Sequence, residues 1–577
     1  MKNCFILFSL VVLVCMLAMK VFSVNGNEKQ PVRNKTNVSE IPRLQKKGQV
    51  TQLIVDNQPF LILGGELHNS STSGFEYMRP IWKRMSEAGL NTVLAAISWE
   101  QIEPVEGQFD FALVDSMVLG ARKENLKLIL LWFGSWKNGR STYVPEWIKK
   151  NQEKYPLAVG ENGKKLIILS TFSKEACDAD TRAFAALMKH IREIDGKEHT
   201  VIMVQVENEM GILWTKRDFS DVANAAFNGM VPSGLMNYFR ENKETLHSGV
   251  LEAWRKNGLK AKGTWEEIFG KGQLFKDWKD LSYLPEELFM AWNYAVYVGK
   301  IAAAGKAEYP LPMFINAHIK QPGNKGDVPG CYPSGGPTPQ VIDVWRAAAP
   351  AIDFLSPDIY NIDEFRYECD QYVRSGNPLF IPETTKGPAG AARAFFTFGK
   401  YHAMGYSPFG IDGLDAGMNS DGIADFKDAY HTMNQLVPLI NKCQGTSNMT
   451  GLLVDEKNYR DTVNLGGFQI IGSLVKSSNN IRPDNNNSTL ITDERHAGGA
   501  LVICTAPGEY IIAGRGIRFD FSSTTNGAGP NTSFLYIEEG SFKNGKWEPL
   551  RRLNGDEFKV ILFPHKSMIY KTAVYTY

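Results

Sequence analysis

Short apolar runs alternate with helical patterns along most of the chain, and this alternation constrains the fold more than any other feature. Helical spacing is seen where Met78, Ile81, Trp82 and Met85 recur three and four residues apart. The strand-like runs are 61–68, 92–98, 127–133, 200–206, 311–316, 352–358, 378–382 and 407–411. Strands alternating with helices predict a parallel sheet, and eight of them predict an α/β fold of the (β/α)8 or TIM barrel type. A doubly wound open sheet is the alternative, but no glycine-rich dinucleotide loop follows the first run.

The first 26 residues have the pattern of a secretory signal peptide. Lys2 precedes an apolar run from Phe5 to Met19, and small residues follow around Ser23 and Gly26. This run is shorter than the roughly 20 residues of a membrane span. Cys15 suggests a lipoprotein, but the residue before it is the bulky Val14, so lipidation is the less favoured interpretation. A secreted or periplasmic location is therefore predicted.

Residue composition and patterning divide the rest of the chain into parts. A polar segment leads to a hairpin at 50–63, and a long insertion separates the fourth and fifth strands. After about Leu439, short β-rich runs between Gly, Asn, Pro and Ser turns predict a C-terminal β-sandwich. The predicted parts are a signal peptide at 1–26, a linker at 27–47, a barrel at 48–438 with an insertion at 211–310, and a β-sandwich domain at 439–577.

The insertion is rich in tryptophan. It carries Trp214, Trp254, Trp265, Trp278 and Trp292. Most of these are expected to pack inserted helices. One or two could instead form a stacking platform over the mouth of the barrel.

Charge and motif content exclude several functions. The 63 Lys and Arg residues nearly cancel the 62 Asp and Glu residues, so recruitment of nucleic acid or an anionic membrane is not predicted. No His-Glu-x-x-His or Gly-x-Ser-x-Gly motif is present, and the cysteines outside the leader are odd in number and unclustered. We predict no metal site, no cofactor and no serine nucleophile.

Carboxylates follow two of the predicted strands. The fourth strand runs into Glu207-Asn208-Glu209, and the seventh runs into Glu383. In a barrel, residues at the C-terminal strand ends line the active site. Two facing carboxylates suit glycoside cleavage, in which one protonates the leaving oxygen and the other attacks the anomeric carbon or activates water.

Three motifs resemble the family 35 β-galactosidases, within the superfamily of barrels with an acid/base after strand four and a nucleophile after strand seven. The motifs are Gly64-Gly-Glu-Leu-His68, Ala88-Gly-Leu-Asn-Thr-Val93, and Trp99 to Phe111 with its Trp-x-x-x-Glu-Pro core. The resemblance implies that Glu209 is the acid/base, Glu383 the nucleophile, and Asn208 a donor to the sugar 2-hydroxyl. Glu207 would point away and be structural.

Further candidates surround this pair. Tyr360 is expected to donate a hydrogen bond to Glu383, with packing on the barrel top as the alternative. Trp99 and Trp136 are expected either to stack on the sugar or to pack in the core, and Glu103 either to position substrate or to fix its loop. The predicted substrate-binding residues are His68, Trp99, Glu103, Trp136, Asn208 and Tyr360.

The chain differs from the family at positions that bear on which sugar is recognised. Asn69 stands where an aromatic residue is usual, Glu100 where Asn is usual, and Phe133-Gly-Ser-Trp136 where Ala-Glu-Trp is usual. The Trp-x-x-x-Glu-Pro pattern is also shared with family 42 galactosidases. The chain looks most like a bacterial branch with one small β-domain, some members of which act on plant xyloglucan.

The predicted function is a retaining, exo-acting β-galactosidase that works by double displacement on oligo- or polysaccharides. In the free enzyme, that mechanism requires a protonated Glu209 and an ionised Glu383. The alternatives are a retaining β-glycosidase of another sugar, such as a β-glucosaminide or β-glucoside, and a non-catalytic carbohydrate-binding barrel.

Overall fold

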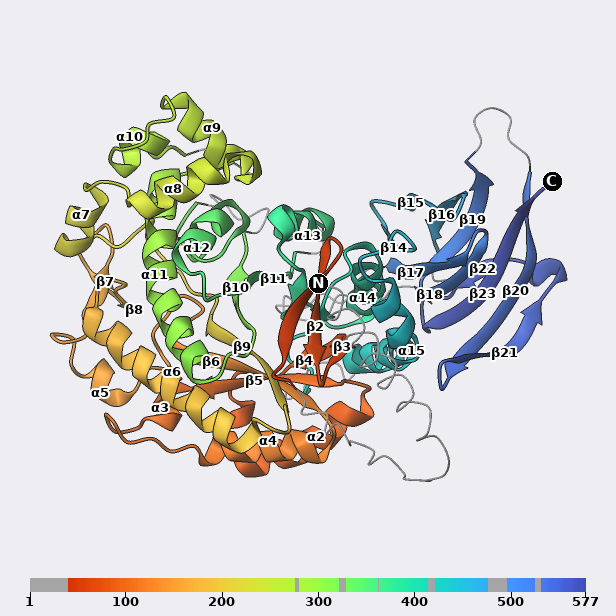
Figure 1. Ribbon diagram of the computed structural model, residues 1–577, viewed down its shortest axis with the longest axis horizontal. Coiled ribbons are helices and arrows are strands. Elements are labelled where there is room, and N and C mark those ends of the chain that lie inside the picture. Colours follow the sequence, from red (N-terminus) through yellow and green to blue (C-terminus); the bar gives the residue numbers. More distant parts are fainter. Residues whose placement is uncertain are drawn as a thin grey trace, which may run out of the picture. The chain divides into compact units, whose positions relative to one another are not determined.

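A computed structural model describes residues 40–274, 280–320, 328–361, 363–413, 421–475, 496–524 and 531–577. Figure 1 shows how the elements are arranged. The predicted signal peptide, the linker up to residue 39 and Trp278 lie outside these ranges. Within them, no helix is both long and apolar enough to cross a membrane.

Eight parallel strands form the central sheet and confirm the (β/α)8 barrel. They are β4 (Ile62–Glu66), β5 (Thr92–Ser98), β6 (Lys127–Lys137), β9 (Val201–Asn208), β10 (Met313–His318), β11 (Phe354–Asp358), β12 (Phe380–Ile381) and β13 (Gly405–Tyr406). Their order is β11-β10-β9-β6-β5-β4-β13-β12. A parallel bridge between Ile359 and Thr384 brings β11 next to β12, so the sheet nearly closes. Every residue of β5 and β9 is buried, which explains why these strands read as continuous apolar runs.

Helices follow the strands around the outside of the barrel (Figure 1). They are α2 (Phe75–Glu87), α3 (Trp99–Ile102), α4 (Ala112–Lys123), α5 (Glu146–Lys149), α6 (Lys174–Asp195), α11 (Leu284–Glu308), α12 (Ile342–Ala348), α13 (Phe365–Tyr372), α14 (Pro388–Lys400) and α15 (Asp421–Cys443). Helix α2 buries Met78, Ile81, Trp82 and Met85, the residues whose spacing predicted it.

The predicted insertion at 211–310 has two different parts. Its first part holds α7 (Asp221–Phe227), α8 (Ser233–Glu241), α9 (Ser248–Lys256) and α10 (Trp265–Phe269). Its last part is α11, which packs against α6 where Gly305 meets Phe184. Helix α11 is therefore a barrel helix, and the prediction of an insertion extending to 310 was wrong at that end.

Several predicted strand boundaries differ from the structure, and two of these differences involve β13 and β1. Strand β13 covers Gly405–Tyr406 instead of 407–411, because only a glycine leaves room between Ile62 and Phe380 at this point. Strand β1 (Arg43–Lys47) lies inside the predicted linker and pairs with β2 (Val50–Val55). Its polar side chains hid it, since an edge strand needs few buried residues.

The predicted hairpin is present, with β2 antiparallel to β3 (Gln58–Phe60). Asp56 and Asn57 between them have φ angles of 51° and 62°, as a tight hairpin turn requires. A second hairpin on the barrel joins β7 (Leu157–Val159) to β8 (Lys165–Leu169).

The C-terminal part consists of two antiparallel sheets, as predicted. The larger sheet contains β14 (Met449–Asp455), β17 (Ala497–Ala506), β18 (Glu509–Arg515), β23 (Met568–Thr576), β20 (Thr532–Lys543) and β21 (Lys546–Leu553). The smaller contains β15 (Arg460–Leu465), β16 (Phe468–Leu474), β19 (Ile517–Ser523) and β22 (Val560–Leu562). Val502 and Tyr510 of one sheet share a core with Ile470 and Phe519 of the other. Helix α15 crosses the boundary predicted at 438/439.

Helix α14 packs directly on β17 and joins the barrel to the C-terminal sheets. A Cβ atom at Gly499 would lie 1.8 Å from the Ala392 carbonyl oxygen and 2.4 Å from its carbon. Both are backbone atoms and cannot rotate away. We expect Gly499→Ala to destabilise the fold by about 1 to 3 kcal/mol, measured as a lower midpoint of urea unfolding.

Gly74→Ala is the matched control for this variant. A Cβ at Gly74 meets nothing closer than 3.9 Å, and its φ of −150° suits any residue. Equal midpoints for Gly499→Ala and Gly74→Ala would contradict the assigned contact between α14 and β17.

Candidate active site

A cavity of about 310 Å³ opens where the barrel strands end. It is lined by Asn69, Lys137, Asn138, Glu209, His318, Asp358, Tyr360, Glu383 and Phe409. These residues lie at or just after the C-terminal ends of β4, β6, β9, β10, β11, β12 and β13. Polar side chains from six strands, and Phe409 from a seventh, therefore converge at the end of the barrel where TIM-barrel active sites lie.

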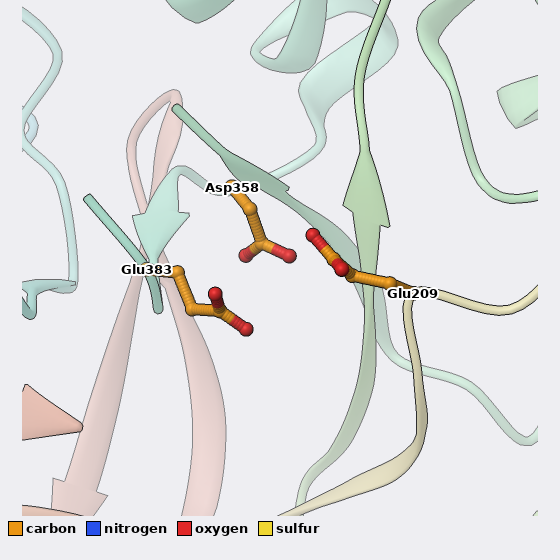
Figure 2. A group of neighbouring side chains, drawn as sticks. All are labelled: Glu209, Asp358 and Glu383. Carbon is orange, nitrogen blue, oxygen red and sulfur yellow. The ribbon is translucent and has the colours of Figure 1, made fainter. Parts of the chain in front are cut away.

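Three buried carboxylates meet in this cavity. Glu209, Asp358 and Glu383 each offer an oxygen within 4.8 Å of the other two. Figure 2 shows the three carboxyl groups turned toward one another, with Glu209 and Glu383 approaching from separate segments. The structure thus brings together the two predicted glutamates and adds an aspartate.

The backbone at the end of β9 sets the direction of Glu209. Glu207 and Glu209 both have left-handed conformations, with φ angles of 64° and 42°. Such conformations are costly for residues other than glycine and cluster at functional sites. The Glu209 N–H donates to Asn316 Oδ1 at 2.9 Å, and its carbonyl accepts from the Gly139 N–H at 3.1 Å. The turn is therefore held from both neighbouring strands.

The Glu209 carboxylate has three polar neighbours. Asn138 Nδ2 donates a hydrogen bond to Oε2. His318 Nδ1 lies 3.8 Å from the same oxygen. The Asp358 carboxyl group forms a side-chain hydrogen bond with that of Glu209.

Glu383 is held by three donors. The Tyr360 hydroxyl donates to Oε2 at 2.9 Å, as the sequence predicted. Asn208 Nδ2 and Asn316 Nδ2 donate to Oε1 at 3.3 and 3.4 Å. Burial raises the pKa of Glu383, while the positive charge of Lys137 acts in the opposite direction.

Lys137 places an ammonium group among the buried carboxylates. Its Nζ donates to Asn208 Oδ1 at 2.6 Å, so Asn208 bridges Lys137 and Glu383. Burial alone would lower the pKa of Lys137, but the charges of the surrounding carboxylates raise it. Lys137 is therefore charged at neutral pH.

Two carboxyl groups beside Glu209 and Glu383 hold their protons more tightly than an ordinary carboxyl group does. Burial and the nearby charge of Glu383 raise the pKa of Asp358 and of Glu66 well above the ordinary range. Asp358 also accepts from Asn316 Nδ2 at 2.7 Å. Asp358 and Glu66 are therefore weaker acids than ordinary carboxyl groups.

Of the six predicted substrate-binding residues, Tyr360 is the one that lines the cavity. Three of the others, Trp99, Trp136 and Glu103, pack in the core or fix a loop. Trp99 is fully buried against Trp132 and Trp147, and Trp136 is fully buried against Tyr294. Their rings cannot stack on a sugar, so the core-packing alternative is the correct one.

The third of them, Glu103, fixes its loop. It accepts from Trp99 Nε1 at 2.7 Å and from the Gly107 N–H at 2.8 Å. Of the two roles predicted for it, the loop role agrees with these contacts.

Two more predicted residues support the site from behind. His68 Nδ1 lies 2.6 Å from Asp412 Oδ1, and its ring packs edge-on against Phe409, which lines the cavity. Glu207 points away from the cavity, as expected, and accepts from the N–H groups of Ser135 and Trp136 at 3.0 and 2.7 Å. Its pKa is raised well above the ordinary range by burial and by the adjacent Asp180.

Sequence reasoning missed most of the polar cavity lining. Lys137 and Asn138 were missed because the third strand continues to Lys137 instead of ending at Phe133. Asn316 and Asp358 are the polar residues within the C-terminal ends of predicted strands, the same signal that identified Glu209 and Glu383. His318 lies just beyond its predicted strand.

The carboxylate cluster is also spaced closely enough to bind a divalent cation. Oxygen ligands of this kind suit Mg²⁺ or Ca²⁺, whereas the ammonium group of Lys137 already supplies positive charge there. That the protein needs no metal or cofactor remains a prediction.

Part of the barrel matches a known protein family. Residues 73–264 match the family model Glyco_hydro_42, described as beta-galactosidase. The family 42 segment contains Trp99, Glu103, Asn208 and Glu209, and it ends before Glu383. Residues 426–564 match a second model, a domain of unknown function (DUF5597), which covers most of the C-terminal sheets.

Two curated relatives align with part of the chain. Beta-galactosidase BgaA of Clostridium cellulovorans is 27% identical over 188 residues, covering 30% of this chain and 26% of that protein. A beta-galactosidase of Xanthomonas manihotis is 29% identical over 175 residues, covering 28% of this chain and 26% of that protein. The chain thus spans about a quarter of the length of these relatives.

Two solved structures align with part of the chain at low identity. The beta-galactosidase of the psychrophilic Marinomonas ef1 aligns with a TM-score of 0.42 and 13% identity, covering 65% of this chain and 60% of that one. The catalytic domain of beta-amylase from Paenibacillus polymyxa aligns with a TM-score of 0.45 and 12% identity, covering 63% and 96%.

The matched family corrects one expectation. The resemblance pointed to family 35, whereas the family 42 model is the one that matches. The Trp-x-x-x-Glu-Pro motif that carried much of the resemblance lies within the family 42 segment and is shared by both families. The expectation of a β-galactosidase-type barrel is unchanged by this correction.

Proposed function

We propose that the protein is a retaining β-galactosidase that cleaves terminal β-galactosides by double displacement. The observation that carries this proposal is the approach of the Glu209 and Glu383 carboxylates to within 4.8 Å. Retaining glycosidases hold their two carboxyl groups about 5 to 5.5 Å apart, whereas inverting enzymes separate them by about 6.5 to 9.5 Å to admit a water molecule. The match of residues 73–264 to a beta-galactosidase family supports galactose as the sugar.

In the first step, Glu383 attacks the anomeric carbon while Glu209 donates its proton to the departing oxygen. The bond from the anomeric carbon to that oxygen breaks as the bond to Glu383 forms, giving a glycosyl ester and a free alcohol. Tyr360, Asn208 and Asn316 hold the Glu383 carboxylate in position for this attack.

In the second step, Glu209 acts as a base. It takes a proton from a water molecule, whose oxygen attacks the anomeric carbon and releases Glu383 as a carboxylate. Asn138 orients the Glu209 carboxylate through its hydrogen bond to Oε2. Two inversions at the same carbon leave the product with the configuration of the substrate.

The size of the cavity supports exo action. Its volume of about 310 Å³ is at the lower end of the roughly 300 to 1,000 Å³ of small-molecule sites, which suits one sugar ring. The signal peptide predicted at 1–26 supports a secreted or periplasmic enzyme, for which plant oligosaccharides such as xyloglucan fragments are accessible substrates.

Product stereochemistry and sugar preference test this proposal. We expect proton NMR during hydrolysis of aryl β-galactoside to show β-galactose first, with the α-anomer appearing later through mutarotation. The galactoside should be the best substrate among the aryl β-galactoside, glucoside, glucosaminide, fucoside and arabinoside.

Each other outcome has a definite meaning. α-Galactose as the first product would overturn the retaining mechanism. A faster glucoside or glucosaminide would keep the mechanism and replace the sugar. Binding of galactosides without turnover of any member would favour a carbohydrate-binding barrel.

A further inference from the structure

Among the tryptophans of the 211–310 region that the structure describes, Trp214 is the most exposed. Trp254 and Trp265 are buried, as expected for residues that pack inserted helices. Trp214 instead exposes 54% of its surface and has a left-handed backbone, with a φ of 66°. A bulky residue in this conformation is uncommon, and such strain is typical of ligand-binding positions.

Neighbouring groups hold Trp214 in this exposed position. Its N–H donates to the Gly330 carbonyl at 2.9 Å. Gly330 lies so close that a Cβ there would be 2.6 Å from the Thr215 carbonyl oxygen. The Arg140 guanidinium lies over the indole ring, 5.1 Å from its centroid. The backbone that carries Trp214 is therefore held in place, and Arg140 contacts its ring.

Trp214 and Arg140 lie on the Glu209 side of the cavity. The turn that carries Arg140 also carries Asn138, which donates to the Glu209 carboxylate, and Gly139, which donates to the Glu209 carbonyl. A Cβ at Gly139 would lie 2.9 Å from the Leu213 side chain, so this turn packs against the segment that leads to Trp214.

The position of Trp214 and Arg140 on the Glu209 side of the cavity matters, because a general acid must lie next to the leaving group. If Glu209 protonates the departing oxygen, the aglycone extends past Glu209, toward Arg140 and Trp214. A flat indole face suits the apolar face of a sugar ring, and an arginine beside it can donate to hydroxyl groups.

We propose that Trp214 and Arg140 form a subsite for the leaving-group sugar, so that the substrates are β-glycosides whose aglycone is itself a saccharide. This inference rests on the proposed glycosidase function. It adds that binding is divided between the barrel cavity for the terminal sugar and an exposed platform for the next one.

Two types of substrate distinguish the site for the terminal sugar from the platform formed by Trp214 and Arg140. β-Galactosyl fluoride has a leaving group too small to reach Trp214, and fluoride departs without protonation. Galactosyl disaccharides with 1,2, 1,3, 1,4 and 1,6 linkages place a sugar ring on the leaving side. We expect Trp214→Ala to lower kcat/KM about tenfold for the best disaccharide and to leave the fluoride within twofold.

Two further variants distinguish stacking from a structural effect. Trp214→Phe should recover most of the disaccharide activity, since it restores a ring. Tyr459→Ala removes a comparably exposed aromatic residue from the C-terminal sheets and should change neither substrate.

The outcomes separate this inference from the proposed function. Equal losses on fluoride and disaccharides in Trp214→Ala, or no loss on any disaccharide, would overturn the subsite while leaving the glycosidase intact. A wild-type protein inert toward both the fluoride and the disaccharides would overturn the proposed function and the subsite with it.

Discussion

Replacing Glu383 by alanine is expected to lower kcat for an aryl β-galactoside by about 10⁴-fold or more, the scale seen when a catalytic nucleophile is removed. The variant keeps Glu209 and the donors around the lost carboxylate but has no oxygen to attack the anomeric carbon. Because truncation leaves space beside Tyr360 and Asn208, azide can enter and attack in its place. We therefore expect azide to restore part of the rate and to give α-galactosyl azide, measured by NMR.

Glu209→Ala provides the complementary result. Here the nucleophile is intact, so an activated aryl galactoside still forms the glycosyl ester, and azide attacks that ester instead of water. The product is then β-galactosyl azide. Opposite configurations from the two variants would assign the two roles without reference to any other protein.

Asp358 is the matched control for this assignment. Asp358 is as buried as Glu383 and lies within 4.8 Å of it, but three donors converge on Glu383. Asp358→Ala is expected to be slower than wild type and not to respond to azide. Azide rescue of Asp358→Ala with no rescue of Glu383→Ala would make Asp358 the nucleophile.

The barrel could be predicted from the sequence because its strands are buried on both sides. β5 and β9 read as unbroken apolar runs, and the polar residues after β9 then marked the open end. The edge strand β1 and the two-residue β13 gave no such signal. β1 is polar, and β13 depends on the absence of a side chain at Gly405, which only the packed neighbours reveal.

The site residues likewise include some that the sequence could predict and some that it could not. Glu209, Glu383 and Tyr360 follow strands whose ends were predicted to within two residues, and all three line the cavity. Trp99 and Trp136 were included because aromatic residues often stack on sugars, yet the face on which a side chain lies depends on the strand register and on the loop that follows. Lys137 was missed for the same reason: the third strand runs four residues further than its apolar pattern.

Lys137 is expected to control the pH at which the enzyme loses activity in acid. Burial raises the pKa of Glu383, and the ammonium group of Lys137 counteracts that rise. Glu383 must be ionised to attack, so activity is lost as the pH falls through its pKa. Removing the positive charge in Lys137→Met raises this pKa further, and the acid limb of kcat/KM should move upward by about 1 to 3 pH units.

Other ionisable groups around Glu383 remain in this variant, namely Glu66, Glu209, Asp358 and Tyr360. None of these groups carries a positive charge, so they cannot compensate for the loss of Lys137. The loss of activity in Lys137→Met should be small at high pH and large near and below neutrality. The reason is that the substitution changes only the fraction of Glu383 that is ionised.

Lys137→Arg separates the charge from the packing of the side chain. Arginine keeps the positive charge but cannot reproduce the 2.6 Å contact from Nζ to Asn208 Oδ1. We expect this variant to lower kcat while its acid limb stays near that of the wild type. An unmoved acid limb in Lys137→Met, with kcat lowered equally at every pH, would show that Lys137 acts only by holding Asn208. A displacement in Lys137→Met that is absent in Lys137→Arg would show that its charge keeps Glu383 ionised.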